Sequence, residues 1–344
     1  MAWASDESYH EDTTNFARHD LVITHQWALD LPWDGQNELE GVRLTASRLP
    51  IARAKRKTLE TTNPSIILLV AVQYRDADEG WLPSDSSWWQ RDAQGNRTRV
   101  GSSYYMLDWH NPSLRTHVAD QARAFVESGV FDGVMFDWWD DSDPDRIDML
   151  EKVRKAIGEE ALIIVNSNTH KAPNSAKYAN GLFMESAFWA NRFTSGMAPE
   201  TPQDWQVLAD TLLWAEANLR RPHINALETW YLKDASELNR MRATTTLALT
   251  HSDGYVLFGD SNHRHDWYEF WDRKELGRPI DTMTRRSDNA YQREFSGGTV
   301  IYNPMGNGKV SVSFAEPRQS AANGQEALTF EVDQMDGDMF LRGS

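Results

Sequence analysis

Two acidic residues of the sequence stand directly after short apolar runs, in positions where carboxylates can carry out chemistry. Asp137 follows residues 134–136 in GVFDGVMFDWWDD, and Glu185 follows residues 182–184 in GLFMESAFW. Cleavage of a glycosidic bond needs one carboxyl group that protonates the leaving oxygen and a second that acts as nucleophile or activates water. A single acid in such a position could equally well cap the following helix or form an ion pair with an arginine. The two together make Asp137 and Glu185 the leading catalytic candidates.

Other acids compete for these roles. Glu228, in HINALETWY, also ends an apolar run and is a third catalytic candidate. It could serve as the acid or base, orient a substrate, or pair with Arg220 or Arg221 as a structural residue. Asp140 follows two tryptophans and is expected either to begin the next helix or to bind a sugar hydroxyl.

Aromatic and amide side chains near the ends of the apolar runs are candidates for substrate binding. Flat rings stack on the apolar faces of sugars, and amides form hydrogen bonds with hydroxyl groups. Turn formation explains Asn166 and Asn168 equally well. The predicted substrate-binding residues are His25, Trp27, Tyr74, Trp109, Trp138, Trp139, Asp140, Asn166, Asn168, Trp189, Trp230 and Asp260.

Metal and cofactor chemistry has weak support in the sequence. His263, His265 and Asp266 in GDSNHRHDWYEF could be metal ligands, but no third ligand with a typical spacing, no HExxH and no calcium loop is found. The sequence has no GxSxG motif and no glycine-rich nucleotide fingerprint. Its lack of cysteine excludes thiolate sites and disulfides. We therefore expect neither a metal nor a cofactor.

The composition narrows the class of partner. The formal net charge of -16 repels phosphate backbones, so nucleic acid is not an expected partner. No apolar run approaches the roughly 20 residues of a membrane span. The 15 tryptophans lie mostly beside polar residues or glycine, which suits a cleft that stacks sugar rings. An oligo- or polysaccharide is the expected partner, and the oligomeric state stays open.

The start of the chain, MAWASDESYH, lacks the basic region and the apolar core of a signal peptide. The chain therefore acts in the cytosol or is the mature form of a secreted protein. The absence of cysteine is compatible with both. We expect an extracellular or periplasmic location and leave the cytoplasm open.

Seven short apolar runs are predicted as buried parallel strands. Helices are predicted between most of them, and three of these begin at a capping side chain followed by proline, at residues 111–112, 143–144 and 201–202. Repeated βα units without a phosphate-binding loop predict a TIM (β/α)8-type barrel. The eighth strand is expected in 38–50 or in 297–303. The seven predicted strands span residues 21–27, 66–74, 131–138, 162–168, 181–185, 223–230 and 255–259.

The pattern changes after residue 260. GGTVIYNP and KVSVSF alternate as antiparallel hairpins do. We predict a catalytic barrel over 1–285 and a small antiparallel β appendage over 286–344 that packs on it. Residues 75–111 form a connection of unusual length with six large aromatic residues, and they are a candidate binding loop.

Several ordered pieces of the chain resemble a known family. They are DLVITHQW, NPSIILLVAV, YYMLDWHNPSLRTHVADQ, FDGVMFDWWDD, GLFMES, and WYEFWDRKELGRPI followed by REFSGGTVIYNP. Over residues 16–314 the chain resembles the provisional glycoside-hydrolase-like family fifteen, which is distantly similar to endo-alpha-1,4-polygalactosaminidases. The resemblance implies a TIM barrel and a carbohydrate substrate. It matches Asp137 as nucleophile or base and Glu185 as general acid, or the reverse.

The sequence departs from that family in its tryptophan-rich residues 76–110 and in Trp138 and Trp139, so the family's substrate is not carried over. The leading hypothesis is a glycoside hydrolase that acts on an oligo- or polysaccharide. One alternative is a non-catalytic carbohydrate-binding barrel whose acids only bond to hydroxyls. Another is a polysaccharide lyase with His25, Tyr231 or His251 as base.

Overall fold

The computed structural model describes residues 1–4, 13–35, 37, 39–186 and 198–343. Eight parallel strands follow one another in the order β1-β2-β3-β6-β7-β8-β9-β10. Their central positions are apolar and buried, as expected for strands covered on both faces. The chain therefore has the predicted TIM (β/α)8-type barrel fold, with a separate antiparallel sheet at its C-terminal end. The eight strands are Ala2–Ala4, Leu21–Thr24, Ile67–Ala71, Gly133–Phe136, Leu162–Asn166, Gly181–Met184, Ala226–Trp230 and Tyr255–Gly259.

The position predicted for the eighth strand is wrong. The missing strand is β1, Ala2–Ala4, which pairs in parallel with β2 from Ala2↔Val22 to Ala4↔Thr24. Residues 298–303 belong to the antiparallel sheet instead, and from residue 39 to 50 the described backbone contributes one isolated bridge at Leu44 and the start of a helix. A three-residue strand is too short to produce a periodic pattern, which is why the sequence does not reveal it.

The helices that lie between parallel strands begin where the capping signals predict. The Asn111 side chain accepts a hydrogen bond from the Ser113 amide, and Asp143 accepts one from the Asp145 amide. Thr201 and Asp204 bond to each other's backbone amides at the start of the next helix. Such caps satisfy donors that have no partner within the helix. The helices are α2 Leu49–Thr62, α3 Pro112–Glu127, α4 Pro144–Ile157, α5 Pro202–Asn218 and α6 Leu238–His251, with 3-10 turns at Thr13–Arg18, Gln26–Leu29, Glu269–Trp271 and Lys274–Leu276.

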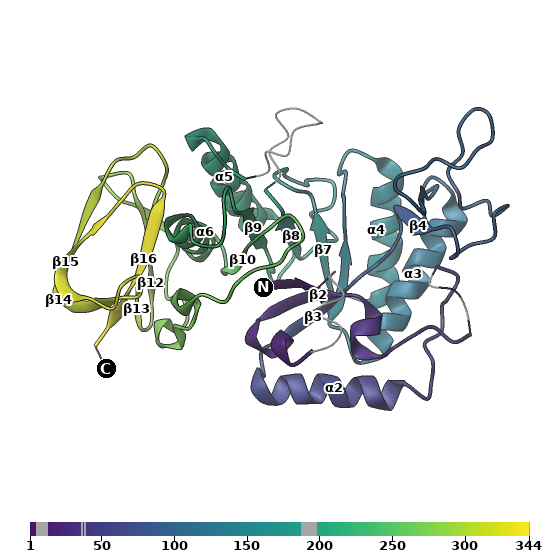
Figure 1. The fold of residues 1–344 in the computed structure, drawn as a ribbon, viewed down its shortest axis with the longest axis horizontal. Coiled ribbons are helices and arrows are strands. Elements are labelled where there is room, and N and C mark those ends of the chain that lie inside the picture. The colour runs from purple at the N-terminus through teal and green to yellow at the C-terminus, as the bar shows by residue number, and fades with distance from the viewer. Residues whose placement is uncertain (5–12, 36, 38, 187–197, 344) are drawn as a thin grey trace. The chain divides into compact units, whose positions relative to one another are not determined.

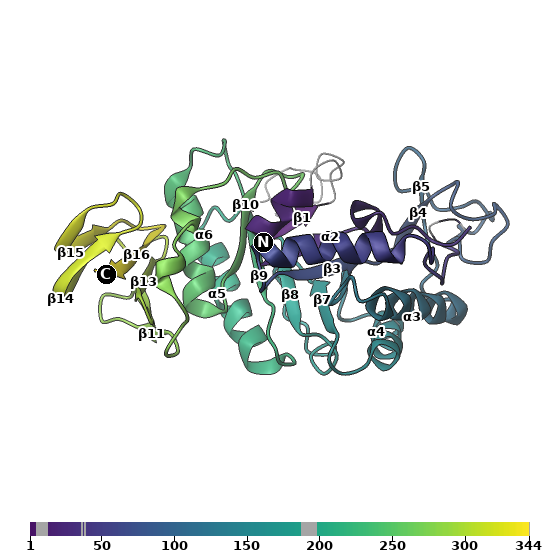
Figure 2. The same ribbon diagram turned by 90° about the horizontal axis from the view of Figure 1, so that it is seen from below.

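The chain divides into two compact units. Met1–Ser167, Ala172–Leu182 and Leu219–Pro222 form the first. In this unit α3 and α4 lie side by side, as Figures 1 and 2 show, and Arg115 of α3 forms an ion pair with Asp145 of α4 at 2.8 Å. The candidate binding loop contains the short hairpin of β4 Asp76–Asp78 and β5 Tyr104–Met106. Its aromatic side chains pack on one another, so it is an ordered insertion.

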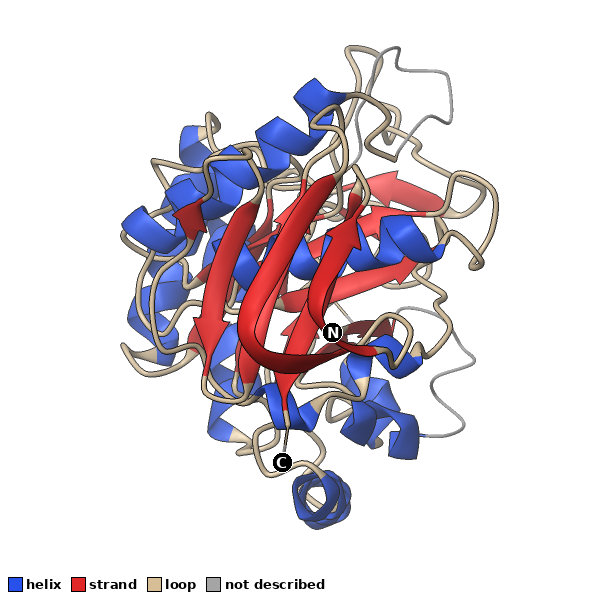
Figure 3. Cartoon of the chain, turned by 90° about the vertical axis from the view of Figure 1, so that its left-hand side faces the viewer, coloured by secondary structure: helices blue, strands red, loops and turns tan. Residues whose placement is uncertain are grey.

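The second unit consists of Asn168–Lys171, Phe183–Asn218 and His223–Ser344. It contains the antiparallel sheet, whose strands run in the order β11-β12-β13-β16-β14-β15 and face the viewer in Figure 3. Helix α6 contacts β9 and β10 and also β13 and β16 of this sheet. The strands are β11 Thr284–Arg285, β12 Tyr291–Phe295, β13 Gly298–Asn303, β14 Val310–Ser320, β15 Glu326–Val332 and β16 Asp336–Arg342.

Small side chains allow α6 to be buried on both faces. Thr244 bonds to Thr229 of β9 through their hydroxyl oxygens, 2.6 Å apart. On the other side, a Cβ placed on Gly337 of β16 would lie 1.9 Å from the Thr246 hydroxyl oxygen. Arg242 also forms two hydrogen bonds with the Asp336 carboxylate, at 2.7 and 2.6 Å. The helix is thus fixed to both sheets by close approach and by a paired charge.

No described helix is both long enough and apolar enough to cross a membrane.

Gly133 provides a test of the packing of the parallel strands. A Cβ at this position of β6 would lie 1.9 Å from the Leu162 carbonyl oxygen of the neighbouring strand β7. We expect Gly133→Ala to lower the free energy of unfolding by about 3 kcal/mol or more, because backbone atoms must move apart. Urea unfolding measures the change. Gly101→Ala is the matched control, since its Cβ would meet its nearest atom at 3.9 Å, and equal stability of the two variants would contradict the packing described.

Candidate active site

Asp137 lies directly after β6 and is half-buried. Its Oδ1 accepts a hydrogen bond from Asn166 Nδ2 at 2.8 Å and another from the Trp138 amide at 2.9 Å. The Tyr74 hydroxyl donates to the carbonyl oxygen of Asp137 at 2.5 Å, and burial raises the pKa of Tyr74 so that this donor stays protonated. The carboxylate is therefore held at the end of β6 by neighbours from β7 and from the segment after β3.

Trp138, which follows Asp137, is the most exposed of the predicted aromatic contacts that the structure describes, with 56% of its surface accessible. The Arg75 guanidinium lies 4.4 Å from the centre of its ring, within cation–π distance. Arg146 donates a hydrogen bond to its carbonyl oxygen. Trp138 therefore presents a flat apolar surface beside a candidate catalytic acid.

Glu185 lies directly after β8 and is also half-buried. Ligand atoms of Glu185, Glu228 and His263 all lie within 4.8 Å of one another. All three residues belong to the second unit. The structure thus brings two of the three predicted catalytic carboxylates together and adds a histidine to them.

Glu228 is fully buried at the third position of β9. Because side chains alternate along a strand and Thr229 points to α6, Glu228 points to the opposite face, where it meets His263. His263 Nδ1 lies 2.9 and 3.0 Å from the two carboxylate oxygens of Glu228. Burial raises the pKa of Glu228 to about 7, opposed by His263 and assisted by the negative charge of Glu185.

His263 is held by a tight turn after β10. The Asp260 carboxylate accepts hydrogen bonds from the amides of Asn262 at 2.8 Å and Arg264 at 2.9 Å. The backbone of His263 has φ +62°, a left-handed conformation that is uncommon outside glycine. Asp260 was predicted to bind substrate, and in the structure it holds the turn that carries His263.

Both leading acids are followed by a residue in the left-handed conformation. Trp138, after Asp137, has φ +51°, and Ser186, after Glu185, has φ +48°. The Ser186 hydroxyl donates to the carbonyl oxygen of Glu228, which fixes this turn to β9. Such conformations persist where the surrounding contacts impose them, and they are concentrated at functional sites. Asp137 and Glu185, which the sequence alone had singled out, are thus each followed by the same kind of backbone turn.

Three of the predicted aromatic contacts, Tyr74, Trp109 and Trp139, are buried with their polar atoms bonded, and Trp230 is buried as well. Tyr74 bonds to backbone, Trp109 Nε1 donates to Asp143 at 2.7 Å, and Trp139 Nε1 donates to Ser175 at 2.8 Å. Their polar atoms bond within the protein and support the backbone around Asp137.

The other predicted contacts are dispersed. After β2, the half-buried rings of His25 and Trp27 stack at 4.5 Å with 17° between their planes. Trp230, at the end of β9, lies 6.3 Å from the ring of His263. Asn166 donates to Asp137, Asn168 has φ +59° after β7, and Asp140 is exposed. Trp189 lies outside the described residues.

Within the described residues, two groups of side chains could geometrically hold a cation. One is the Glu185, Glu228 and His263 cluster; the other is His110, Asp143 and Asp145. In the second group Asp143 caps α4, and Asp145 pairs with His110 at 2.7 Å. Within the described residues, neither group includes His265 or Asp266. The hypothesis that these two residues bind a metal together with His263 therefore has no geometric support.

Comparisons with known proteins bear on the fold. No protein-family model and no curated protein matches the chain. A noncanonic maltogenic alpha-amylase from Thermotoga neapolitana has a TM-score of 0.59 at 12% identity, covering 98% of this chain and 94% of its own. A cyclic alpha-maltosyl-(1→6)-maltose hydrolase from Arthrobacter globiformis has a TM-score of 0.56 at 13% identity, covering 97% and 88%.

A third similar structure is an alpha-amylase from Geobacillus thermoleovorans complexed with acarbose, with a TM-score of 0.53 at 11% identity and coverage of 96% and 90%. These neighbours are glycoside hydrolases that act on oligo- and polysaccharides. At such low identity the likeness shows a shared barrel fold. The comparisons do not confirm the particular family that the sequence resembles.

Sequence reasoning missed the role of His263. It considered this residue as a metal ligand, whereas in the structure His263 bonds to Glu228, 35 residues away along the chain. The available signal was the position of His263 shortly after β10 and two residues before His265. Neighbouring parallel strands end side by side, so a residue after β10 can meet a residue of β9. The partner itself depends on the turn that Asp260 closes, and this turn has no distinctive sequence.

The buried carboxyl of Glu228 predicts a pH-dependent stability. Its pKa is raised from an ordinary 4.5 to about 7, so its contribution to stability is complete below pH 4.5 and is lost as the pH rises through 7. The difference is on the order of 3 kcal/mol at about 1.4 kcal/mol per pKa unit. We expect Glu228→Gln to lose less stability than the wild type between pH 5 and pH 8 in urea unfolding. Parallel losses in both proteins would contradict this ionisation.

Proposed function

We propose that the protein is a glycoside hydrolase that cleaves an oligo- or polysaccharide with Asp137 and Glu185 as its two catalytic carboxylates. The main support is the half-buried Glu185 at the end of β8, backed by the buried pair of Glu228 and His263. In TIM-barrel enzymes the active site is built at the C-terminal ends of the strands. Asp137 follows β6, which is two strands from β8 in the order of the sheet.

The local contacts favour distinct roles for the two acids. Asp137 is oriented by donors from Asn166 and the Trp138 amide, which suits a carboxylate that acts as nucleophile or base. Glu185 lies beside Glu228, whose raised pKa keeps a proton in the cluster up to about pH 7. A proton held there suits the general acid that protonates the leaving oxygen. We therefore assign Glu185 as acid.

Glu228 acts as a positioning residue in this proposal. Its side chain is fully buried, so a sugar cannot reach it without a rearrangement, while Glu185 is partly accessible. The Glu228 carboxyl loses its proton near pH 7, and a carboxylate oxygen of Glu185 lies within 4.8 Å of it. His263 holds the Glu228 carboxylate in place through Nδ1.

Trp138 supplies a surface for a sugar ring. It is exposed, directly follows Asp137 and is covered on one side by the Arg75 guanidinium. The buried Trp109 and Trp139 keep the surrounding backbone in place. As finer proposals, we assign the chain to the family fifteen that its sequence resembles and to an extracellular or periplasmic location.

The lyase alternative finds little support in the described contacts. His251, one of the bases considered, is buried against Tyr291 and Tyr302 at the end of α6, and burial lowers its pKa to about 4. A histidine that packs on the C-terminal sheet is not placed to abstract a proton beside Glu185. Formation of unsaturated products in the assay below would restore this alternative.

Reducing-end release tests the two catalytic assignments. The wild type, Asp137→Asn and Glu185→Gln would be assayed on a panel that includes α-linked glucans and galactosaminoglycans, with folding verified by thermal melts. We expect each variant to lose about 10²- to 10⁴-fold in kcat/KM, the typical contribution of a catalytic acid or base. Asp120→Asn, which changes a half-buried acid of α3 that pairs with Arg123, is the control. A fully active Glu185→Gln would refute the proposed acid, and binding without release would favour the non-catalytic barrel.

The pH profile of kcat/KM tests the positioning role. We expect wild-type activity to fall above about pH 7, when Glu228 loses its proton and a negative charge appears beside Glu185. In Glu228→Gln this fall should no longer lie near pH 7, although the variant still folds. Asp338→Asn is a matched control, because Asp338 is another buried acid, in β16, with its pKa raised by burial to about 6. The same alkaline limb in wild type and Glu228→Gln would show that Glu228 has no part in the reaction.

A further inference from the structure

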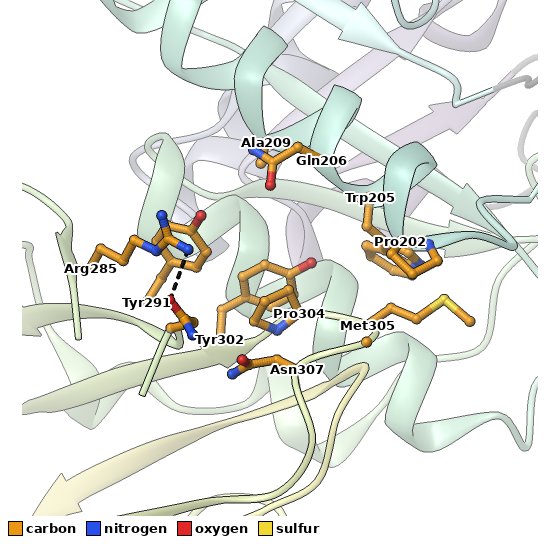
Figure 4. Close-up of a pocket in the computed structure, with 12 residues that line it drawn as sticks. Pro202, Trp205, Gln206, Ala209, Arg285, Tyr291, Tyr302, Pro304, Met305 and Asn307 are labelled. Carbon is orange, nitrogen blue, oxygen red and sulfur yellow. Dashed lines mark hydrogen bonds between the residues drawn. The ribbon is translucent and has the colours of Figure 1, made fainter. Parts of the chain in front are cut away.

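A pocket of about 240 Å³ lies between the first turns of α5 and the antiparallel sheet, entirely within the second unit (Figure 4). Its walls come from Trp205 of α5, from Tyr291 and Tyr302 of β12 and β13, and from the turn that follows β13. None of the candidate catalytic acids lines it. The volume is below the roughly 300 Å³ at which pockets for drug-sized ligands begin, so it suits one or two small rings.

The pocket is shaped by a close approach of backbone segments. Gly306, in the turn after β13, has φ +87°, and a Cβ there would lie 3.1 Å from Cγ of Pro202. The Gly306 amide donates to the Gln334 side chain at 2.8 Å, which ties the turn to the segment between β15 and β16. One wall of the pocket is therefore a fixed turn packed on the start of a helix.

Two buried donors in the pocket wall have no hydrogen-bond partner within the described structure. They are the Tyr302 hydroxyl and the Trp205 Nε1–H, and each side chain is about 1% exposed. Burial raises the pKa of Tyr302, so its hydroxyl remains a donor over the whole physiological range. Buried polar groups are nearly always paired, and an orphan group in a pocket indicates a missing ligand atom or water.

Packed aromatic rings make up the same wall. The rings of Tyr291 and Tyr302 stack with centroids 6.1 Å apart and 22° between their planes, and the ring of Trp205 lies 6.4 Å from that of Tyr302. Figure 4 shows the Tyr302 ring between the other two. Aromatic faces next to fixed hydroxyl and indole donors match a sugar ring, which has C–H groups on its faces and hydroxyls around its edge.

The charges around the pocket select against ionic ligands. No carboxylate or histidine is among the described lining residues. Among the described lining residues the one cation is Arg285, which donates to Asn289 Oδ1 at 2.9 Å and lies 6.0 Å from the Tyr291 ring. The other polar lining groups, such as Gln206 and Asn307, are uncharged amides. A cationic sugar would find no counter-ion there, and an anionic one would have to displace Asn289.

We propose that this pocket is a binding site for one neutral sugar unit, separate from the strand-end acids. The sugar ring lies against the aromatic wall of Tyr291, Tyr302 and Trp205, and its hydroxyls accept hydrogen bonds from Tyr302 and Trp205. The site retains one end of a glycan on the C-terminal sheet. It does not depend on whether the chain hydrolyses that glycan.

Titration with glucose and galactose tests the site, because these monosaccharides have no bond to hydrolyse. Binding to the full chain would be followed by ligand-observed NMR, with glucosamine and glucose 1-phosphate as charged comparators. We expect saturable binding of at least one neutral sugar and weaker binding of both charged ones. Tyr302→Phe keeps the ring and removes the donor, so the affinity should fall about tenfold, the effect of one hydrogen bond to a buried group.

Three further variants make the result decisive. Tyr268→Phe removes a buried hydroxyl that bonds to the Ala235 carbonyl oxygen at 3.0 Å, outside the pocket, and should leave the affinity unchanged while it lowers the melting temperature. Tyr302→Phe should melt at or above the wild-type temperature, because its hydroxyl has no partner to lose. Trp205→Phe should weaken binding, and Glu185→Gln should not.

Several outcomes would overturn the proposal. They are the absence of saturable binding by either neutral sugar, equal affinity of Tyr302→Phe and the wild type, or tighter binding of a charged comparator. Loss of monosaccharide binding in Glu185→Gln would place the sugar at the strand-end acids and would also refute the separate site. Hydrolase activity has no bearing on any of these readings, so the site and the proposed reaction can fail independently.

Discussion

The burial of α6 on both of its faces is the constraint on which the second unit depends. A helix that packs against a sheet on one side can keep large polar side chains on the other, but α6 has β9 and β10 on one face and β13 and β16 on the other. Its interior positions are therefore alanine, threonine and other side chains that tolerate close contact. Thr244 of the helix bonds to Thr229, so Thr229 points from β9 towards α6. Its neighbour Glu228 therefore points to the opposite face of the strand, where His263 and Glu185 lie.

The carboxyl of Glu228 shows how this packing is coupled to chemistry. Surrounded by protein, it cannot be solvated, and its charged form is disfavoured until a partner compensates for the lost water. His263 provides part of that compensation, and it can do so because Asp260 closes a turn that forces His263 into the left-handed conformation. A group with an altered proton affinity is thus produced by the packing of strands and turns, at some cost in stability.

Much of the fold could be predicted from sequence because its signals are local. Short apolar runs in residues 66–74 or 162–168 contain buried strands, and Asn111 and Asp143 mark the starts of helices through hydrogen bonds that span two residues. The strand Ala2–Ala4 could not be predicted, since its three residues carry no period and are defined by the neighbour with which they pair.

The candidate site likewise contains some residues that could be predicted from sequence and others that could not. Asp137 and Glu185 could be selected because each ends an apolar run, a property of the sequence alone. The bond between His263 and Glu228, and the orphan donors of Tyr302 and Trp205, depend on residues that are far apart in the chain and meet through tertiary packing. Buried or exposed surroundings also decide that Trp138 offers a free face whereas Trp109 does not.

The double-sided burial of α6 also bears on how such a chain can vary during evolution. The C-terminal sheet covers one face of this helix and is joined to it by the paired charges of Arg242 and Asp336. If the sheet were lost, small apolar side chains selected for close packing would face water, and the exposed face would favour aggregation. The sheet is thus an integral part of the fold and not an interchangeable module. Insertions are best tolerated at its rim, for example in the exposed turn at residues 322–325 between β14 and β15.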